Sequence, residues 1–180
     1  MQHRKRQITL KQRMGLCLAA FFAAFAMQLT LNGYQSRAVQ AVQDAQMGCF
    51  NAISRFQGGV ESSISILEAY RWENGETEEM LEKLQAACST SNAWLWRIRS
   101  NMDGLQNVSD EQWVLYGAVE TTYGSYNTLL EELESYLSSG QEAKASQLYY
   151  NKVSVCGGYL SQYTMQLLKA SILDAQTTYT

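Results

Sequence analysis

The chain of 180 residues contains no proline, and this absence constrains the fold more than any other feature. Proline interrupts helices and is common in turns and at sheet edges, so a sheet-rich domain of this length normally contains several. Strand signals, meaning alternating Val, Ile or Thr between turn dipeptides, are missing as well. The sequence therefore predicts an all-α protein.

Glycine and asparagine, which commonly end helices, divide the chain into segments. They stand at three places: Asn74-Gly75, Asp103-Gly104 and Ser139-Gly140. Ser109 and Gln112 fit a capping box, the pattern that starts a helix. Together these signals predict four helices, over about 33–73, 76–103, 110–138 and 141–180.

Each predicted helix carries apolar residues at alternating spacings of three and four. The stripe of the first helix starts at Val42, and that of the second includes Leu95 and Ile98. The stripe of the third is Leu115, Val119, Thr122, Tyr126, Leu129, Leu133 and Tyr136. Four such stripes joined by short turns predict an antiparallel up-down-up-down four-helix bundle.

The N-terminus has the pattern of a membrane anchor. Residues 1–13 hold five of the 14 basic residues and none of the 17 acidic ones, and Met14 to Leu31 carry no charge. A helix of this length spans about 27 Å, close to the thickness of a bilayer core. Basic residues mark the cytoplasmic side. We therefore expect a cytoplasmic tip over 1–13, a transmembrane helix over 14–32 and an extracytoplasmic domain over 33–180, in the cell membrane.

A cleaved signal peptide is the alternative. Ala24-Phe25-Ala26 fits a cleavage site behind an apolar run of about a dozen residues. Against cleavage, the apolar run continues to Leu31, and the basic head is longer than signal peptides need. The sequence favours the uncleaved anchor and leaves a secreted protein, released after Ala26, open.

The composition excludes several kinds of active site. His3 is the single histidine and lies in the basic tip, which rules out histidine metal clusters and Ser-His or Cys-His relays in the folded part. The acidic body lacks the basic, aromatic-rich surface of nucleic-acid binders. We expect no catalytic residue, no metal, no cofactor and no nucleic-acid partner.

The layout resembles the sensor region of bacterial transmembrane receptors. The outer helices would be about 40 residues long and the inner pair about 28, so the last helix would reach the membrane near Thr180. The opening ITLKQRMGLCLAAFF is similar to the start of a sensor histidine kinase. The resemblance implies a parallel homodimer, a small-molecule or protein stimulus, and kinase domains beyond Thr180. Chemoreceptors share the layout and are the alternative.

One level of the predicted bundle is rich in glycine. Counting from the turns places five residues at one height: Gly58, Gly59, Gly124, Gly157 and Gly158. Glycine inside a helix costs up to about 1 kcal/mol relative to alanine, so this layer calls for a reason. It predicts a hinge, or a ligand cavity ringed by Tyr123, Tyr126, Tyr159 and Tyr163. Close helix packing is the simpler alternative.

Aromatic and basic residues gather near the end of the inner helix pair. Trp94, Arg97 and Trp113 are candidates for an anionic or aromatic ligand, which they would hold by stacking and paired hydrogen bonds. An apolar plug closing the bundle is the alternative.

Three cysteines lie outside the predicted membrane span, namely Cys49, Cys88 and Cys156. All three fall on core stripes, which favours buried thiols over a disulfide or a metal or redox site.

Overall fold

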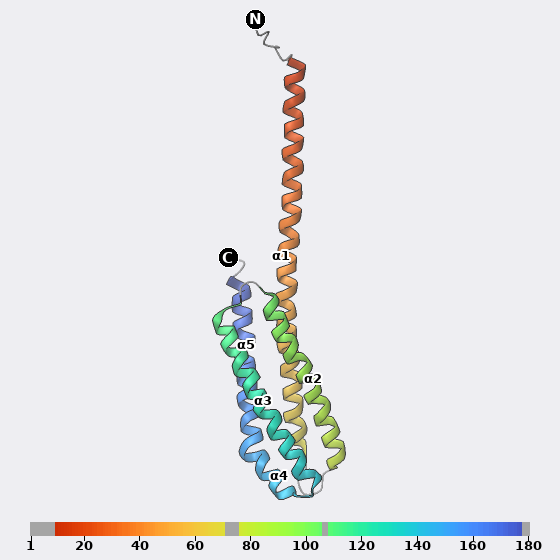
Figure 1. Cartoon of the computed structure of the whole chain (residues 1–180), viewed down its shortest axis with the longest axis vertical. Coiled ribbons are helices and arrows are strands. Elements are labelled where there is room, and N and C mark those ends of the chain that lie inside the picture. The colour runs from red at the N-terminus through yellow and green to blue at the C-terminus, as the bar shows by residue number, and fades with distance from the viewer. Residues whose placement is uncertain (1–9, 71–75, 106–107, 178–180) are drawn as a thin grey trace, which may run out of the picture. The chain divides into compact units, whose positions relative to one another are not determined.

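The computed structural model describes residues 10–70, 76–105 and 108–177, and for residues 10–20, 38 and 174–177 it describes the backbone alone. The elements in chain order are α1 (Leu10–Ala69), α2 (Thr77–Gly104), α3 (Asp110–Ser138), α4 (Glu142–Leu148), the π-helix η1 (Tyr149–Val153) and α5 (Ser154–Thr177). Since α4, η1 and α5 follow without a break, they make up one helix, so the described residues form four helices. Figure 1 shows their arrangement. The described residues contain no strand, which confirms the all-α prediction.

The chain divides into two compact units, residues 1–43 and residues 44–180. In the first unit, six large apolar side chains are each more than half exposed: Phe21, Phe22, Phe25, Met27, Leu29 and Leu31. Among the residues that the structure describes, no helix has the length and hydropathy of a membrane span. The predicted anchor begins at residues 14–20, whose side chains are not described, and residues 1–9 of the predicted tip lie outside the described residues.

In the second unit, helices that follow each other in the sequence run in opposite directions (Figure 1). Pairs of neighbouring residues show this antiparallel arrangement. Between α1 and α2 they are Gly48 with Asn101 and Gly59 with Ser91, and between α2 and α3 they are Gln85 with Glu134 and Arg99 with Glu120. Between α3 and α5 they are Gln112 with Ser171 and Thr122 with Cys156. The helices α2 and α3 differ from the predicted 76–103 and 110–138 by at most one residue at each end.

The core face of α3 corrects the predicted stripe. Its buried apolar residues form an unbroken 3-4 repeat: Tyr116, Val119, Tyr123, Tyr126, Leu130, Leu133 and Leu137. The predicted Leu115, Thr122, Leu129 and Tyr136 each precede one of these and are only half-buried. Adjacent helical residues point about 100° apart, so a one-residue shift moves a side chain from the centre of the seam to its edge. In the first unit, Val42 is 41% exposed, so α1 begins its core stripe later than predicted.

The predicted capping box at the start of α3 is confirmed. Ser109 Oγ accepts a hydrogen bond from the backbone N–H of Gln112 at 3.3 Å, and Gln112 Oε1 accepts one from the backbone N–H of Ser109 at 3.1 Å. The buried Gln112 side chain also donates to Ser171 Oγ at 3.2 Å, which ties the start of α3 to α5. At the other end of α3, Gly140 has a φ of 69°, the left-handed conformation that glycine adopts most easily.

The fourth helix differs from the single α-helix predicted over 141–180. Its buried positions Ala145, Tyr149, Val153 and Gly157 recur every four residues. An α-helix has 3.6 residues per turn, so such a run drifts off one face, whereas a wider π-turn keeps it aligned. The π-helix at Tyr149–Val153 supplies that wider turn.

Candidate functional site

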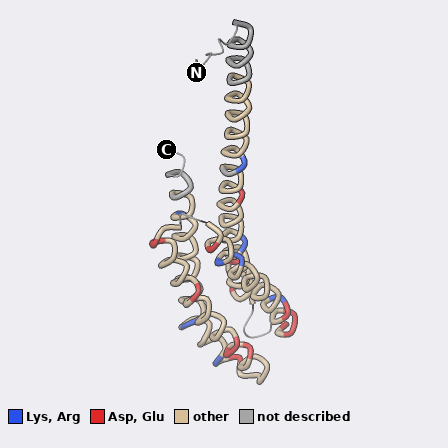
Figure 2. Tube along the Cα trace, turned by 45° about the horizontal axis from the view of Figure 1, so that its top comes forward, with Lys and Arg blue, Asp and Glu red and all other residues tan. Residues whose placement is uncertain are grey.

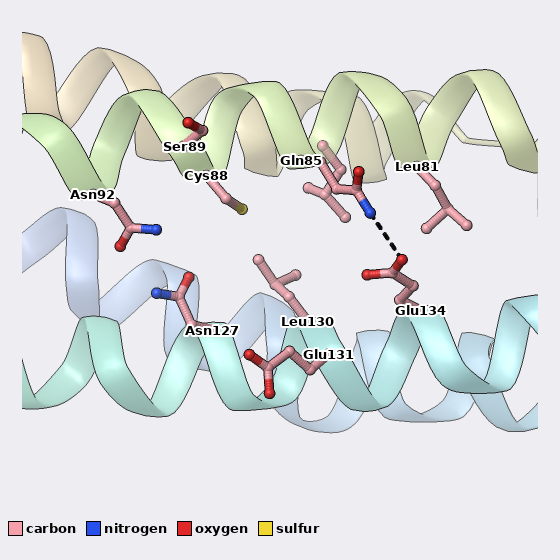
Figure 3. Close-up of a pocket in the computed structure, with 10 residues that line it drawn as sticks. Leu81, Gln85, Cys88, Ser89, Asn92, Asn127, Leu130, Glu131 and Glu134 are labelled. Atoms are coloured by element: carbon pink, nitrogen blue, oxygen red, sulfur yellow. Dashed lines mark hydrogen bonds between the residues drawn. The ribbon is translucent and has the colours of Figure 1, made fainter.

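A pocket between α2 and α3 is the candidate site, and we call it the α2–α3 pocket (Figure 3). Its volume is about 320 Å³. It is lined by Leu81, Leu84, Gln85, Cys88, Ser89 and Asn92 of α2 and by Asn127, Leu130, Glu131 and Glu134 of α3. These positions recur at intervals of three and four, which places them on the facing sides of two antiparallel helices.

The floor of the pocket is apolar and its rim is polar. Leu84 and Leu130 are buried, and Leu81 is half-buried beside them. At the rim, Gln85 Nε2 donates to Glu134 Oε1 at 2.9 Å across the gap between the helices (Figure 3). A ligand in this pocket would meet apolar surface below and hydrogen-bonding groups above.

Two carboxamides and a thiol define the other end of the pocket. The side chains of Asn92 and Asn127 face each other from opposite helices, and the Cys88 sulfur points between the helices (Figure 3). Burial, and secondarily the negative charge of Glu134, raise the pKa of the Cys88 thiol to about 11. A thiol with this pKa stays protonated at neutral pH, so it is neither a nucleophile nor a ready metal ligand. Cys88 therefore adds an uncharged sulfur surface to this end of the pocket.

Acidic residues dominate this part of the bundle. Figure 2 shows Asp and Glu positions, in red, gathered along the chain where α2 begins and where α3 ends. Glu131 and Glu134 contribute two of them to the pocket lining, which contains no lysine or arginine. The pocket thus has a negative electrostatic potential.

A second groove lies between α1 and α2, with a volume of about 650 Å³. Small residues line most of it: Ser54, Gly58, Gly59 and Ser62 of α1, with Ala86, Ala87 and Thr90 of α2. At one end two guanidinium groups lie near the Trp94 ring, with Arg97 Cζ 4.6 Å and Arg55 Cζ 6.0 Å from its centroid. The charged residues that line this α1–α2 groove, Arg55 and Lys83, are basic. Its charge is therefore opposite to that of the α2–α3 pocket.

The four tyrosines predicted to ring a cavity differ in burial. Tyr123 and Tyr126 are buried in the core, Tyr163 is half-buried and Tyr159 is 55% exposed. The Tyr123 hydroxyl donates to the Cys88 carbonyl at 3.0 Å, and its ring packs edge-to-face on Phe56. None of the four lines the α2–α3 pocket or the α1–α2 groove.

The five glycines separate into inner and outer positions. Gly59 and Gly157 are buried, whereas Gly58, Gly124 and Gly158 are exposed and have open space where a Cβ would stand. A Cβ at Gly157 would lie 3.1 Å from Ile64 Cδ1 and 3.3 Å from Tyr126 Cε2. Close helix packing therefore accounts for the two inner glycines.

Trp94 and Trp113 belong to different clusters among the described contacts. Trp94 borders the α1–α2 groove with Arg55 and Arg97, whereas Trp113 packs edge-to-face against Tyr116 on α3, with ring centroids 6.1 Å apart. The predicted ligand site of Trp94, Arg97 and Trp113 is thus drawn from two places in the bundle.

Cys49, Cys88 and Cys156 are free thiols, the first buried and the others half-buried. Within the part of the chain that the structure describes, no cluster of three His, Cys, Asp or Glu residues is placed to hold a metal ion.

The α2–α3 pocket was not predicted, although the sequence contains a signal for it. Asn92 and Asn127 stand in the middle of helices, where asparagine is unfavourable. In the register that pairs Gln85 with Glu134, residues 92 and 127 stand opposite each other, and the facing sides of the helices place both asparagines in one pocket.

The chain matches no protein-family model, no curated protein and no solved structure. No role is therefore transferred from a relative, and the site must be interpreted through its own chemistry.

Proposed function

We propose that this chain is the membrane anchor and extracytoplasmic sensing region of a bacterial transmembrane receptor, in the first place a sensor histidine kinase. The uncharged run from Met14 to Leu31, preceded by five basic residues, carries the proposal. The four-helix bundle with a ligand-sized pocket supports it, because such bundles convert binding into small shifts of packed helices.

The continuity of α1 is a second argument. Its 60 residues from Leu10 to Ala69 are helical throughout, so the backbone passes from the apolar run into the bundle without a loop. The exposed Phe21, Phe25 and Leu29 are a poor surface for water and a good one for lipid. In the proposed receptor, a parallel homodimer, shifts within the bundle travel along α1 and the fourth helix.

Two alternatives share parts of this argument. A chemoreceptor sensor region has the same layout, and sequencing of the gene downstream of the codon for Thr180 tests kinase against chemoreceptor. The motif Ala24-Phe25-Ala26 favours a secreted helical binding protein that is released after Ala26. The intact mass of the mature protein separates anchor from secretion, since cleavage leaves Met27 at the N-terminus.

Cysteine labelling tests the topology. In a chain whose native cysteines are replaced by alanine, Glu142→Cys adds a thiol at an exposed position of α4. A maleimide that cannot cross the cell membrane should label the thiol at residue 142 in intact cells whose outer envelope has been permeabilised. The matched control, Lys5→Cys in the basic tip, should react only after lysis. Protection of residue 142 until lysis would contradict the proposed topology.

A further inference from the structure

The charge of the α2–α3 pocket selects among ligands. Two carboxylates, Glu131 and Glu134, lie in its lining, and none of its ten lining residues is basic. The nearby Lys83 turns to the α1–α2 groove and pairs with Glu79 on its own helix. An anion entering the pocket would meet uncompensated negative charge, whereas a cation would be attracted.

The acceptors of the pocket suit a group with several N–H donors. Glu134 Oε1 already accepts from Gln85, which fixes the carboxylate and leaves its other oxygen available. The side chains of Asn92 and Asn127 lie at the other end of the pocket, two helical turns from Glu134 (Figure 3). An ammonium group has three donors and no acceptor, so one donor can bond the free Glu134 oxygen while water accepts from the others.

The remaining lining suits a short hydrocarbon chain. Leu81, Leu84 and Leu130 form the apolar floor, and the uncharged thiol of Cys88 extends it. A volume of about 320 Å³ lies at the low end for ligand pockets, which favours a small molecule over a peptide.

We propose that the α2–α3 pocket binds a small primary ammonium ion with a short apolar chain. Its ammonium group is held by the free carboxylate oxygen of Glu134, and its alkyl chain lies on the leucine floor and points toward the Asn92–Asn127 pair at the other end of the pocket. Glu131 strengthens attraction from the solvent side. This inference rests on the proposed function only in taking the amine as the receptor's stimulus. Binding itself requires the pocket alone.

Three probes of equal length test the charge selection: n-butylammonium, 1-butanol and butyrate. The full chain, in a neutral detergent, is titrated with each probe while NMR follows the side-chain amide signals of Asn92 and Asn127. Butylammonium should shift both signals in a saturable manner, with an affinity at least about fivefold above that of butanol. Butyrate should cause no saturable shift. Equal affinities for butylammonium and butanol, or tighter binding of butyrate, would overturn the proposal.

Variants locate the site. Glu134→Gln should weaken butylammonium binding about fivefold or more, and Glu131→Gln, a change at an exposed position, should weaken it about twofold to fivefold. The matched control is Glu82→Gln, which removes the same charge from an exposed position of α2 outside the pocket lining. It should keep the affinity within a factor of two. Equal losses in the control and in both pocket variants, at unchanged helix content, would show nonspecific attraction and remove the site.

The two proposals fail separately. Saturable butylammonium binding together with a protected Glu142→Cys would keep the pocket and reject the receptor topology. Correct topology without butylammonium binding would keep the receptor and reject the amine as its ligand.

Discussion

Gly59 of α1 lies so close to Ser91 of α2 that a Cβ at residue 59 would overlap the serine hydroxyl. Ser91 is buried and donates its hydroxyl to the Ala87 carbonyl at 3.0 Å, one turn earlier in α2. This close approach of α1 and α2 combines a missing side chain on α1 with a small side chain on α2 that is hydrogen-bonded to its own helix.

We predict that Gly59→Ala lowers the free energy of unfolding by about 1–3 kcal/mol, because the added methyl group overpacks this contact. In a Ser91→Ala background the same change should cost less by at least about 1 kcal/mol, since Ser91 Cβ and N, the next nearest atoms, would be 3.4 Å away. Urea titrations of the four chains of this double-mutant cycle measure the coupling. Additive effects would contradict the close approach.

Alanine substitutions at the adjacent Gly157 and Gly158 should have opposite effects on stability. Gly157→Ala should destabilise the bundle by about 1–3 kcal/mol, because Ile64 and Tyr126 would be 3.1 and 3.3 Å from the new Cβ. Gly158→Ala faces open space and should stabilise it by about 0.4–1 kcal/mol, through the reduced freedom of the unfolded chain. Thermal unfolding followed by circular dichroism compares the two. Stabilisation by both would show that the α1–α3–α5 contact is looser than described.

The helical class could be predicted from the sequence because its causes are local. The absence of proline and the capping box of Ser109 and Gln112 both act within one or two helical turns. The structure confirms the helices and the capping box that they predict. The core face of α3 depends on tertiary contacts instead. Tyr123, which the predicted stripe lacks, is buried there, and its hydroxyl donates to the Cys88 carbonyl on α2, a partner that no one-dimensional pattern reveals.

The π-turn and the pocket lie beyond sequence reasoning for related reasons. The spacing of four from Ala145 to Gly157 becomes informative only when the buried face is known. Asn92 and Asn127 are ordinary polar residues until two helices turn them toward one space. In both cases the deciding quantity is the rotation of a helix about its axis, and a shift of one residue changes that rotation by about 100°.

A buried hydrogen bond between α1 and α3 supports a third prediction. Ser63 Oγ donates to the Val60 carbonyl at 2.7 Å, so the Tyr126 hydroxyl, 3.0 Å away, must be the donor to Ser63. Ser63→Ala would leave that hydroxyl without its acceptor and should cost about 1–3 kcal/mol. Adding Tyr126→Phe removes the orphaned hydroxyl, so the double variant should be more stable than Ser63→Ala alone. A double variant that is less stable would contradict this hydrogen-bond direction.

Alkaline pH should destabilise the bundle through Cys49, which is only 2% exposed. Burial raises the pKa of its thiol from 9.0 to about 11, although a hydrogen bond with Ser171 acts in the opposite direction. Below pH 9 the thiol is protonated in both states, and its contribution to stability is complete. Between pH 9 and 11 the unfolded chain loses the proton while the native chain keeps it. Stability should therefore fall with rising pH across this window, by about 2 kcal/mol from this residue.

Comparison with Cys49→Ala isolates that contribution, since the pKa values of Tyr116 and Tyr123, raised to about 12 mainly by burial, add a similar trend at higher pH. Urea titrations at pH 8, 9, 10 and 11 should show a shallower decline in free energy of unfolding for the variant. Ile53→Val, a core truncation nearby that removes no titratable group, should lower stability at every pH and keep the wild-type slope. Equal slopes for the wild type and Cys49→Ala would mean that the thiol ionises as easily in the native bundle as in the unfolded chain.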